Sequence, residues 1–320
     1  MSTCDYPLRL KPLFRRYLWG GRRLATMLGK PLGPGDDYAE SWEVVDHGED
    51  QSVVAAGPAS GLTLHQLVVE QAADLLGQHA PRIQFPLLLK FLDCNRTLSV
   101  QVHPNDEQAA RLDPPDLGKT EAWVVLAADP GSKIFAGLKP GVTREDLHEA
   151  VLAGQCEACL HEFEPLVGDC VFIEAGTVHA LGAGLVIAEI QQASDTTFRL
   201  FDFNRVDAHG KPRQLHVDQS LATIDYSLGP VAPVQPKATS QSGRERLVQC
   251  DKFVLDRLRL SGPHTIGGDE RFHLLVGIEG QSTVAGEKLS QGESLLLPSA
   301  AGAVELGPQP AATVLDIYLP

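Results

Sequence analysis

Apolar residues along the chain occur mostly in short runs that end at glycine, proline or other turn residues. These runs are rich in Val, Ile and Leu and have the length of a single strand. The predicted strands cover residues 98–103, 121–128, 169–176, 184–191, 196–203, 271–280 and 293–299. Helical patterns are too few to alternate with them as βαβ units require. The pattern therefore predicts a mainly β protein built from sandwiches or barrels.

Two segments instead show the three- and four-residue apolar spacing of an amphipathic helix. Residues 62–78 follow this spacing, and Thr63 is placed to cap the helix. Residues 143–154 repeat the signature, with Thr143 followed three residues later by Asp146. We expect these helices on connections between strands of the first half of the chain.

The chain of 320 residues is long enough for two domains of about 150 residues each. Residues 227–244 concentrate Pro, Ser and Gly and have no periodic apolar face, which indicates a linker. We predict a first domain at residues 1–226 that carries the helices and the chemistry, and a small β-barrel at residues 245–320.

A weak internal repeat links the two parts. Residues 168–179 and 292–303 both begin with glycine and an acidic residue, continue as an apolar strand and end in a turn of small residues. The first copy ends in His179 and the second in Ala303. A duplicated barrel that kept a site in one copy only would produce this pattern, so we expect no metal in the second barrel.

Charge and composition exclude several classes of function. The chain has 27 basic and 41 acidic residues and a formal net charge of −14, which disfavours binding to nucleic acids and anionic membranes. No apolar run approaches the ~18 residues of a membrane span, and the N-terminal residues lack the apolar core of a signal peptide. We expect a cytoplasmic protein that is a monomer or a weak homodimer.

The six cysteines are too sparse for a disulfide scaffold. Cys156 and Cys159 form one C-x-x-C pair, which can indicate redox chemistry or half of a zinc site. No second pair accompanies them, and their surroundings resemble the end of an amphipathic helix. We therefore interpret them as ordinary thiols.

Three polar residues alternate with valines in the segment 98–103. On a strand, Ser99, Gln101 and His103 share one face. The face is either exposed to solvent or turned inward, and an inward polar face must be satisfied by a partner.

Two further segments offer polar side chains of the same kind. Lys119 and Glu121 share a face at the start of the next predicted strand, and His179 follows a glycine turn that ends another one. Buried Lys and Glu residues need a partner, a metal ion or a charged ligand. Together Gln101, His103, Glu121 and His179 would offer one amide, two imidazoles and one carboxylate, a mixed N/O set that suits Zn²⁺, with Mn²⁺ or Co²⁺ as substitutes.

Six motifs in this order resemble the type I mannose-6-phosphate isomerase (phosphomannose isomerase) family in its short bacterial form. They are Trp19-Gly-Gly, Glu40-Ser-Trp-Glu43, Ser99-Val-Gln-Val-His-Pro104, Gly118-Lys-Thr-Glu121, Ala175-Gly-Thr-Val-His179 and residues 189–199, from Glu189 to Arg199. The resemblance covers about residues 14–205.

The resemblance implies a fold of two cupin (jelly-roll) β-barrels, the second of them non-catalytic. It implies one Zn²⁺ per chain, held by Gln101, His103, Glu121 and His179, and a small sugar phosphate as substrate. Mannose 6-phosphate and fructose 6-phosphate would interconvert through a cis-enediol. Ser99, Lys119 and Arg199 would bind the substrate, and Arg199, Glu189 and Lys119 would be catalytic.

Several alternatives stay open at this point. Lys119 can hold the phosphate or act in proton transfer. A metal-dependent cupin oxygenase and an inactive regulator that binds a sugar phosphate are the rival functions. Two further histidines receive structural interpretations, since His216 lies on a predicted strand or edge and His273 has no acidic or histidine companion at cupin spacing.

Overall fold

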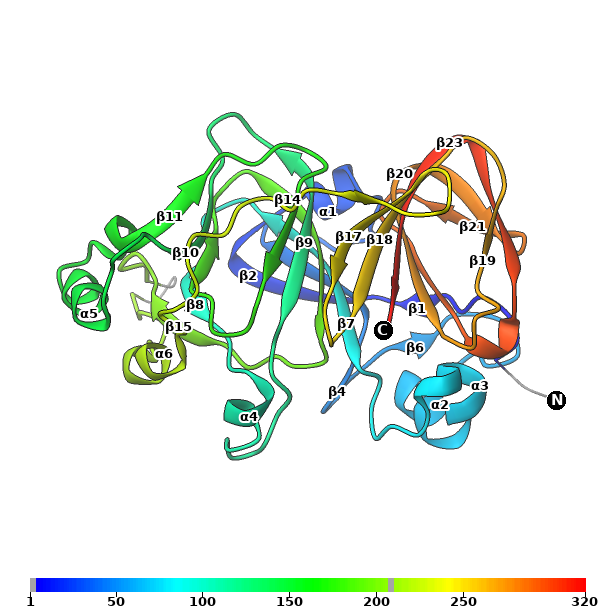
Figure 1. Ribbon diagram of the computed structural model, residues 1–320, viewed down its shortest axis with the longest axis horizontal. Coiled ribbons are helices and arrows are strands. Elements are labelled where there is room, and N and C mark those ends of the chain that lie inside the picture. The colour runs from blue at the N-terminus through cyan, green and yellow to red at the C-terminus, as the bar shows by residue number, and fades with distance from the viewer. Residues whose placement is uncertain (1–3, 207–209) are drawn as a thin grey trace.

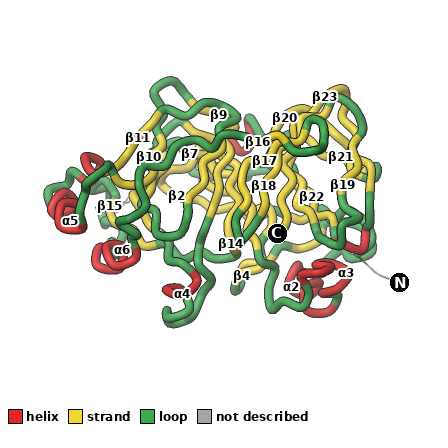
Figure 2. Tube along the Cα trace, viewed as in Figure 1, coloured by secondary structure: helices red, strands yellow, loops and turns green. Residues whose placement is uncertain are grey.

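Most of the regular structure is antiparallel β-sheet, arranged as two units that lie side by side. The computed structural model describes residues 4–206 and 210–320. Strands form the body of both units, and helices lie at their edges and ends (Figures 1 and 2). The mainly β fold class predicted from the sequence is confirmed.

The N-terminal unit is a sandwich of two sheets with an apolar core between them. In spatial order, the six-stranded sheet contains β12 (Cys170–Ile173), β9 (Glu121–Ala128), β14 (Leu185–Gln192), β7 (Leu87–Cys94), β3 (Tyr38–Val44) and β2 (Leu13–Gly21). The five-stranded sheet contains β11 (Leu160–Phe163), β10 (Ile134–Leu138), β13 (His179–Leu181), β8 (Val100–Val102) and β15 (Phe198–Phe201). Two small pairs, β1 (Leu10–Lys11) with β6 (Val53–Val54) and β4 (Asp46–His47) with β5 (Asp50–Gln51), complete it. Trp123, Ile187 and Leu181 belong to the core that fills the space between the two sheets.

The C-terminal unit is built on one eight-stranded sheet. Its main path runs through β16 (Lys237–Ala238), β17 (Arg244–Gln249), β18 (Val254–Leu260), β23 (Val304–Tyr318), β20 (His273–Val284) and β21 (Glu287–Ser290). β19 (His264–Ile266) pairs with β23, and β22 (Ser294–Leu297) pairs with β20. Strand β16 and the first residue of β17 fall inside residues 227–244, so part of the predicted linker is sheet.

Short helices occupy the connections. They are α1 (Arg23–Thr26), α2 (Leu64–Glu70), α3 (Ala72–Leu76), α4 (Asp106–Ala109), α5 (Arg144–Leu152) and α6 (Val217–Thr223), with 3₁₀ turns η1 (Gly77–His79), η2 (Cys156–Cys159) and η3 (Ser299–Ala301). Thr63 and Thr143 cap α2 and α5 as predicted, because each hydroxyl accepts a hydrogen bond at 3.1 Å from the backbone N–H three residues later. In the part of the chain that the structure describes, no helix is both long and apolar enough to cross a bilayer.

The C-x-x-C pair lies in η2, a separate turn that follows the end of α5 at Leu152, rather than on the helix itself. Cys156 and Cys159 are free thiols that pack into an apolar cluster with Leu147. Burial raises the pKa of both thiols, so the thiolate form that redox chemistry or metal binding requires is disfavoured.

The two units share a continuous apolar core. Val124 and Ala188, on the outer face of the six-stranded sheet, belong to the same cluster as Leu255 and Ile317 of the C-terminal sheet. Near the N-terminus, the backbone of Leu8 pairs with Leu296 of β22 through hydrogen bonds of 2.7 and 2.9 Å. The division into residues 1–226 and 245–320 stays a prediction, since both ends of the chain contribute to the C-terminal side.

The internal repeat has a structural counterpart. Gly168 and Gly292, which precede β12 and β22, have φ angles of 91° and 80°, values that glycine adopts without strain. In both turns the acidic residue after the glycine, Asp169 or Glu293, accepts a hydrogen bond of 2.8 Å from the backbone N–H three residues before it. The same turn thus stands at the same place in both units, which supports a duplication.

A buried ionic cluster occupies the inner face of the C-terminal sheet. His273 lies between Asp316 (Nδ1 to Oδ1, 2.7 Å) and Asp269 (Nε2 to Oδ1, 3.1 Å), and Arg244 pairs with Asp316 and Asp256. Neither partner stands at the cupin spacing considered in the sequence, since Asp269 precedes His273 by four residues and Asp316 follows it by 43. Burial alone would lower the pKa of His273, but the two aspartates outweigh it and raise the pKa to about 9.

His273 should therefore stabilise the fold in a way that depends on pH. A histidine whose pKa is raised on folding contributes fully below its unfolded pKa of about 6.5 and loses the contribution as the pH rises through about 9. Between these values we expect the free energy of unfolding to fall by roughly 3 kcal/mol on account of this residue. His273→Gln should lack that decrease in denaturant titrations at pH 6 and pH 10. The same pH dependence in wild type and variant would contradict the assignment; His264→Gln, on the same sheet and bonded to the Ser242 carbonyl, serves as control.

Candidate active site

The polar residues of the segment 98–103 face the interior of the N-terminal sandwich. Ser99 and His103 are 4% and 1% exposed, and Gln101 lies between them on β8. The solvent-exposed alternative for this face is therefore excluded. Strand β13 pairs with β8 so that His179 stands directly opposite Gln101.

Three side chains from three strands or strand ends converge at this point. Glu121 begins β9 in the opposite sheet, and its carboxylate oxygens lie 3.6 Å from His103 Nε2 and 3.4 Å from His179 Nε2. One ligand atom from each of these three residues lies within 4.8 Å of the others. The side-chain amide of Gln101 adds a fourth group, with Nε2 at 3.3 Å from His179 Nε2, and half a turn of the amide would present its oxygen there instead.

Both imidazoles are oriented for metal binding by backbone carbonyls. Nδ1 of His103 lies 3.0 Å from the Thr196 oxygen, and Nδ1 of His179 lies 2.9 Å from the Thr177 oxygen. A carbonyl can only accept, so each Nδ1 carries the hydrogen and each Nε2 presents a lone pair to the cluster. Burial lowers the pKa of both histidines, to about 4 for His179, which keeps the rings neutral.

The carboxylate of Glu121 provides the test of whether an ion fits. Glu121 is fully buried, and the ammonium of Lys119 lies 2.8 Å from its Oε2 and 2.9 Å from His103 Nε2. Its Oε1, which faces His179 Nε2 at 3.4 Å, has no hydrogen-bond donor among the described residues. A buried carboxylate oxygen without a donor is costly. The donor set and the unpaired Oε1 fit a divalent cation.

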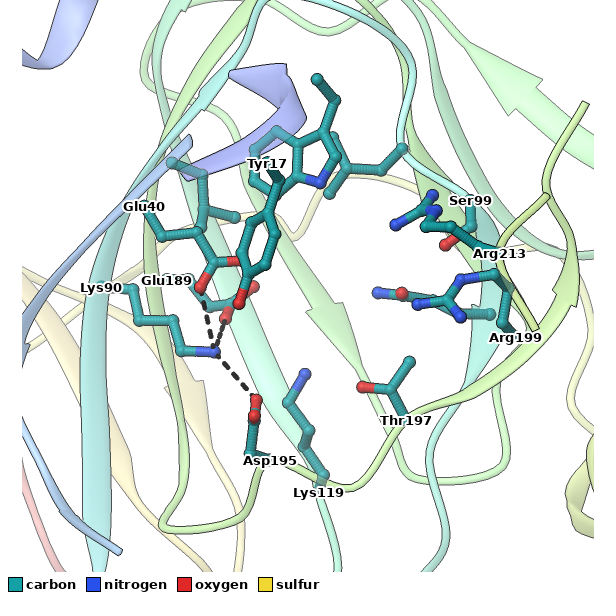
Figure 3. A pocket seen from close by; sticks show the side chains of 14 residues that line it. Tyr17, Glu40, Lys90, Ser99, Lys119, Glu189, Asp195, Thr197, Arg199 and Arg213 are labelled. Carbon is teal, nitrogen blue, oxygen red and sulfur yellow. Dashed lines mark ion pairs between the residues drawn. The ribbon is translucent and has the colours of Figure 1, made fainter. Parts of the chain in front are cut away.

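A pocket of about 270 Å³ opens beside these residues (Figure 3). Its wall comes from both sheets of the sandwich and from the segment after β14. The lining residues are Tyr17, Trp19, Glu40, Lys90, Leu92, Leu98, Ser99, Gln101, Lys119, Glu189, Asp195, Thr197, Arg199 and Arg213. Nearly all of them are polar or charged, which suits a small hydrophilic ligand.

One side of the pocket holds three carboxylates around a buried lysine. Lys90 Nζ lies 3.7–3.8 Å from oxygens of Glu40, Glu189 and Asp195, as the dashed lines of Figure 3 show. Burial alone would lower the pKa of Lys90, but the carboxylates outweigh it and raise the pKa. Burial, followed by the charge of Glu121, raises the pKa of Glu189. The other oxygen of Glu189 accepts a hydrogen bond of 3.0 Å from Trp123 Nε1.

The other side of the pocket is cationic. Arg199 and Arg213 both extend toward the cavity in Figure 3. Arg199 stands opposite Gln101 in the pairing of β15 with β8, and its Nη1 donates to the Gln214 carbonyl at 2.8 Å. Arg213 is held by Asp202, with Nε 2.8 Å from Oδ2. Burial and the charge of Arg213 lower the pKa of Arg199. Two neighbouring guanidinium groups form a surface that favours an anion.

Simple alternation predicts that Thr197, Arg199 and Phe201 share one face, and this is wrong for Phe201. Thr197 and Arg199 line the pocket, whereas Phe201 packs into the apolar cluster on the other side with Leu200. The register of β15 against β8 shifts between Arg199 and Phe201, and such an irregularity turns the following side chain away.

Several charged or phenolic residues of the pocket received no role from the sequence. Tyr17, Lys90 and Arg213 lie outside the quoted motifs, whereas Glu40 and Asp195 lie within them but were not assigned to the site. Lys90 interrupts the apolar run Leu87–Cys94, all of which is buried, and a lysine in such a run is a signal for a charged partner. Arg213 lies in a loop far along the chain and offered no comparable signal. His216 occupies the N-cap position of α6 rather than a strand or edge, and its side chain makes no capping hydrogen bond. Its Nδ1 accepts a hydrogen bond of 3.2 Å from the Arg199 backbone N–H, and its own N–H donates to the Arg199 carbonyl at 2.7 Å, which is a structural role.

Fold and site together define a β-sandwich protein in which three buried side chains that could hold a divalent cation lie beside a polar pocket. A sequence model of the family described as phosphomannose isomerase type I, catalytic domain, matches residues 8–122. Mannose-6-phosphate isomerase ManA of Bacillus subtilis is 36% identical over 305 residues, which are 94% of this chain and 95% of that protein. Mannose-6-phosphate isomerase of Streptococcus mutans is 35% identical over 299 residues, 92% of each chain.

The fold agrees with this similarity along nearly the whole chain. The crystal structure of mannose 6-phosphate isomerase from Bacillus subtilis superposes with a TM-score of 0.89 at 28% identity, over 98% of this chain and 99% of that one. The chain therefore belongs to the type I phosphomannose isomerase family and is an isomerase. The family gives no support to the oxygenase alternative.

Proposed function

We propose that the protein is a zinc-dependent isomerase that interconverts mannose 6-phosphate and fructose 6-phosphate through a cis-enediol. The observation that carries the proposal is the convergence of His103, Glu121 and His179 beside a pocket with one acidic and one cationic side. The relatives in Bacillus subtilis and Streptococcus mutans are named for the same activity.

Zinc is the metal that best suits these donors. Two ligand atoms about 2.1 Å from a tetrahedral ion lie about 3.4 Å apart, and the carboxylate oxygens of Glu121 lie 3.4 Å from His179 Nε2 and 3.6 Å from His103 Nε2. The Gln101 amide nitrogen lies 3.3 Å from His179 Nε2, in the position that its oxygen would take after half a turn of the amide. We therefore propose Gln101, His103, Glu121 and His179 as the ligands. A bound Zn²⁺ would act as a Lewis acid toward the carbonyl and hydroxyl oxygens of the sugar.

The phosphate is proposed to bind at the cationic end of the pocket, away from the ligand cluster. Ser99 lies two residues from Gln101 on the same strand, a displacement of about 7 Å. Arg213, anchored by Asp202, lines the same pocket and provides a fixed cation. Arg199 stands opposite Gln101 and is therefore closer to the metal end, where its charge would stabilise an enediolate as well as help bind the substrate.

Lys119 is proposed to act at the carbonyl end rather than on the phosphate. Its ammonium lies against Glu121 Oε2 and His103 Nε2, two atoms that would bind the ion, so it would move aside into the adjoining pocket when the ion is bound. From there it would remain near C1 and C2 of a sugar whose oxygens face the ion, and several bonds away from O6. It can then supply positive charge to the oxygens of the enediolate.

Glu189 is the proposed group for moving the proton between C1 and C2. Trp123 fixes one of its oxygens, and the other faces Lys90 on the same side of the pocket, at 3.7 Å. A carboxylate with a raised pKa is a stronger base than an exposed one and holds a proton more readily between the two carbons. Lys90 fixes the carboxylate from the side opposite to Trp123.

A coupled assay on the purified protein tests the proposed function. We expect fructose 6-phosphate to form from mannose 6-phosphate, and unphosphorylated mannose to react at least about 10²-fold less efficiently, since it cannot use the cationic end of the pocket. Binding of mannose 6-phosphate without turnover would instead support the alternative of an inactive regulator. Turnover that is equally efficient with mannose would contradict the proposed phosphate position.

A further inference from the structure

Three hydrogen bonds hold the segment Gly118–Glu121, which carries Lys119 and the ligand Glu121. Each is donated by the backbone N–H of one of the three residues that precede strand β9. The Gly118 N–H donates to Asp106 Oδ1 at 2.8 Å, and the Lys119 N–H donates to the Pro104 carbonyl at 2.9 Å. The Thr120 N–H donates to Gln192 Oε1 at 3.1 Å. The position of these two site residues therefore depends on two side chains outside the pocket, Asp106 and Gln192.

Asp106 and Gln192 are themselves joined. The side-chain amide of Gln192 donates to Asp106 Oδ1 at 2.8 Å, so one carboxylate oxygen receives both this N–H and the Gly118 N–H. The approach at Gly118 is close, because a Cβ added there would lie 2.5 Å from the Asp106 nitrogen. Asp106 also follows His103 by three residues. Asp106 thus links the chain segment that carries His103 to the segment that carries Glu121.

The remaining oxygen of Asp106 is bound from the C-terminal unit. Lys252 Nζ lies 2.7 Å from Asp106 Oδ2, and the next residue, Phe253, packs edge-on against Phe172 of β12 with ring centroids 6.4 Å apart. Burial would raise the pKa of Asp106, but Lys252 together with Gln192 and Gly118 outweighs it and lowers the pKa. The carboxylate therefore stays charged and engaged at both oxygens.

We propose that Lys252 is a positioning residue that acts through Asp106 and Gln192 to fix the segment Gly118–Glu121, so that the C-terminal unit holds the active site in its working geometry. The inference deepens the proposed function and rests on it for its catalytic consequence. Its structural consequence, a more rigid segment beside the ligands, can be measured without substrate or metal.

The test compares Lys252→Met and Lys252→Arg with Lys237→Met, which changes an exposed lysine on β16 of the same sheet. Hydrogen exchange of the metal-free proteins is followed at the Gly118 and Thr120 amides. We expect exchange there to be about 10-fold faster in Lys252→Met, near the wild-type rate in Lys252→Arg, and unchanged in Lys237→Met. Competition with a chelator should show a Zn²⁺ dissociation constant about 10-fold higher in Lys252→Met, as for other residues that support metal ligands.

The variant Asp106→Asn tests whether Lys252 acts through Asp106. If it does, the double variant Lys252→Met/Asp106→Asn should show exchange rates and a Zn²⁺ dissociation constant no higher than those of the more impaired single variant. Wild-type exchange at Gly118 and Thr120 in Lys252→Met, an equal effect in Lys237→Met, or an equal acceleration along β14 would each overturn the proposal. Failure of the wild-type protein to isomerise mannose 6-phosphate would overturn the proposed function alone, because the exchange comparison does not depend on it.

Discussion

Replacement of His179 by alanine should remove the bound Zn²⁺ and lower kcat by about 10³-fold or more. His179 would contribute one of the two proposed imidazole ligands, and its loss leaves Glu121 and His103 without the third group of the cluster. A catalytic metal ion supplies several kcal/mol of stabilisation to the transition state, and each 1.4 kcal/mol corresponds to about a factor of ten. Elemental analysis and steady-state kinetics on the purified variant measure both effects.

Two further variants make this result specific. Gln101→Ala removes a neutral and weaker ligand, so part of the metal should remain bound. His148→Ala changes an exposed residue on α5 and should retain both zinc and activity. The wild-type protein is also chelated exhaustively, and elemental analysis confirms that it holds no transition metal. If this metal-free protein kept its full kcat, the proposed role of the metal would be wrong.

Arg199→Ala should lower kcat by about 10²-fold or more while zinc stays bound. The guanidinium cannot act as a base in proteins, so its contribution must be a fixed positive charge next to the reacting oxygens. Its position opposite Gln101 supports this, and its Nη1 is already oriented by the Gln214 carbonyl, which limits reorganisation during the reaction.

Arg213→Ala is the matched comparison, since it removes the neighbouring guanidinium at the end of the pocket proposed for the phosphate. There we expect mainly a higher KM with a smaller change in kcat. A reversal of these two patterns, with Arg199→Ala affecting only KM and Arg213→Ala only kcat, would exchange the roles proposed for the two arginines.

Features encoded locally could be predicted from the sequence. The helix starts at Thr63 and Thr143 depend on residues three positions apart, and the shared face of Ser99, Gln101 and His103 follows from strand alternation, which left its inward direction open. The candidate ligands could be grouped by their chemistry, as polar residues on predicted strand faces and strand ends, and the family resemblance then implied that residues 103, 121 and 179 hold one ion.

Features that depend on tertiary structure could not be predicted. The departure of Phe201 from alternation depends on the register of β15 against a strand 100 residues earlier. The contact of His273 with Asp316, the ion pairs of Lys90, and the contact of Lys252 with Asp106 each join segments that are far apart in the chain. Long-range ion pairs leave no periodic pattern in the sequence, whereas a buried lysine inside an apolar run does indicate that a partner exists.

The matching turns at Gly168 and Gly292 bear on how such a chain evolves. After a duplication, the second copy is released from the need to keep metal ligands, and its inner face can accept other charged residues provided that they neutralise one another. His273, Asp316 and Arg244 form such a set. Selection on the second copy can then act on its stability and on its contacts with the first copy rather than on catalysis. Charged residues in its interior can change only together, so that their charges stay balanced. In the first copy, each residue of the site is constrained individually.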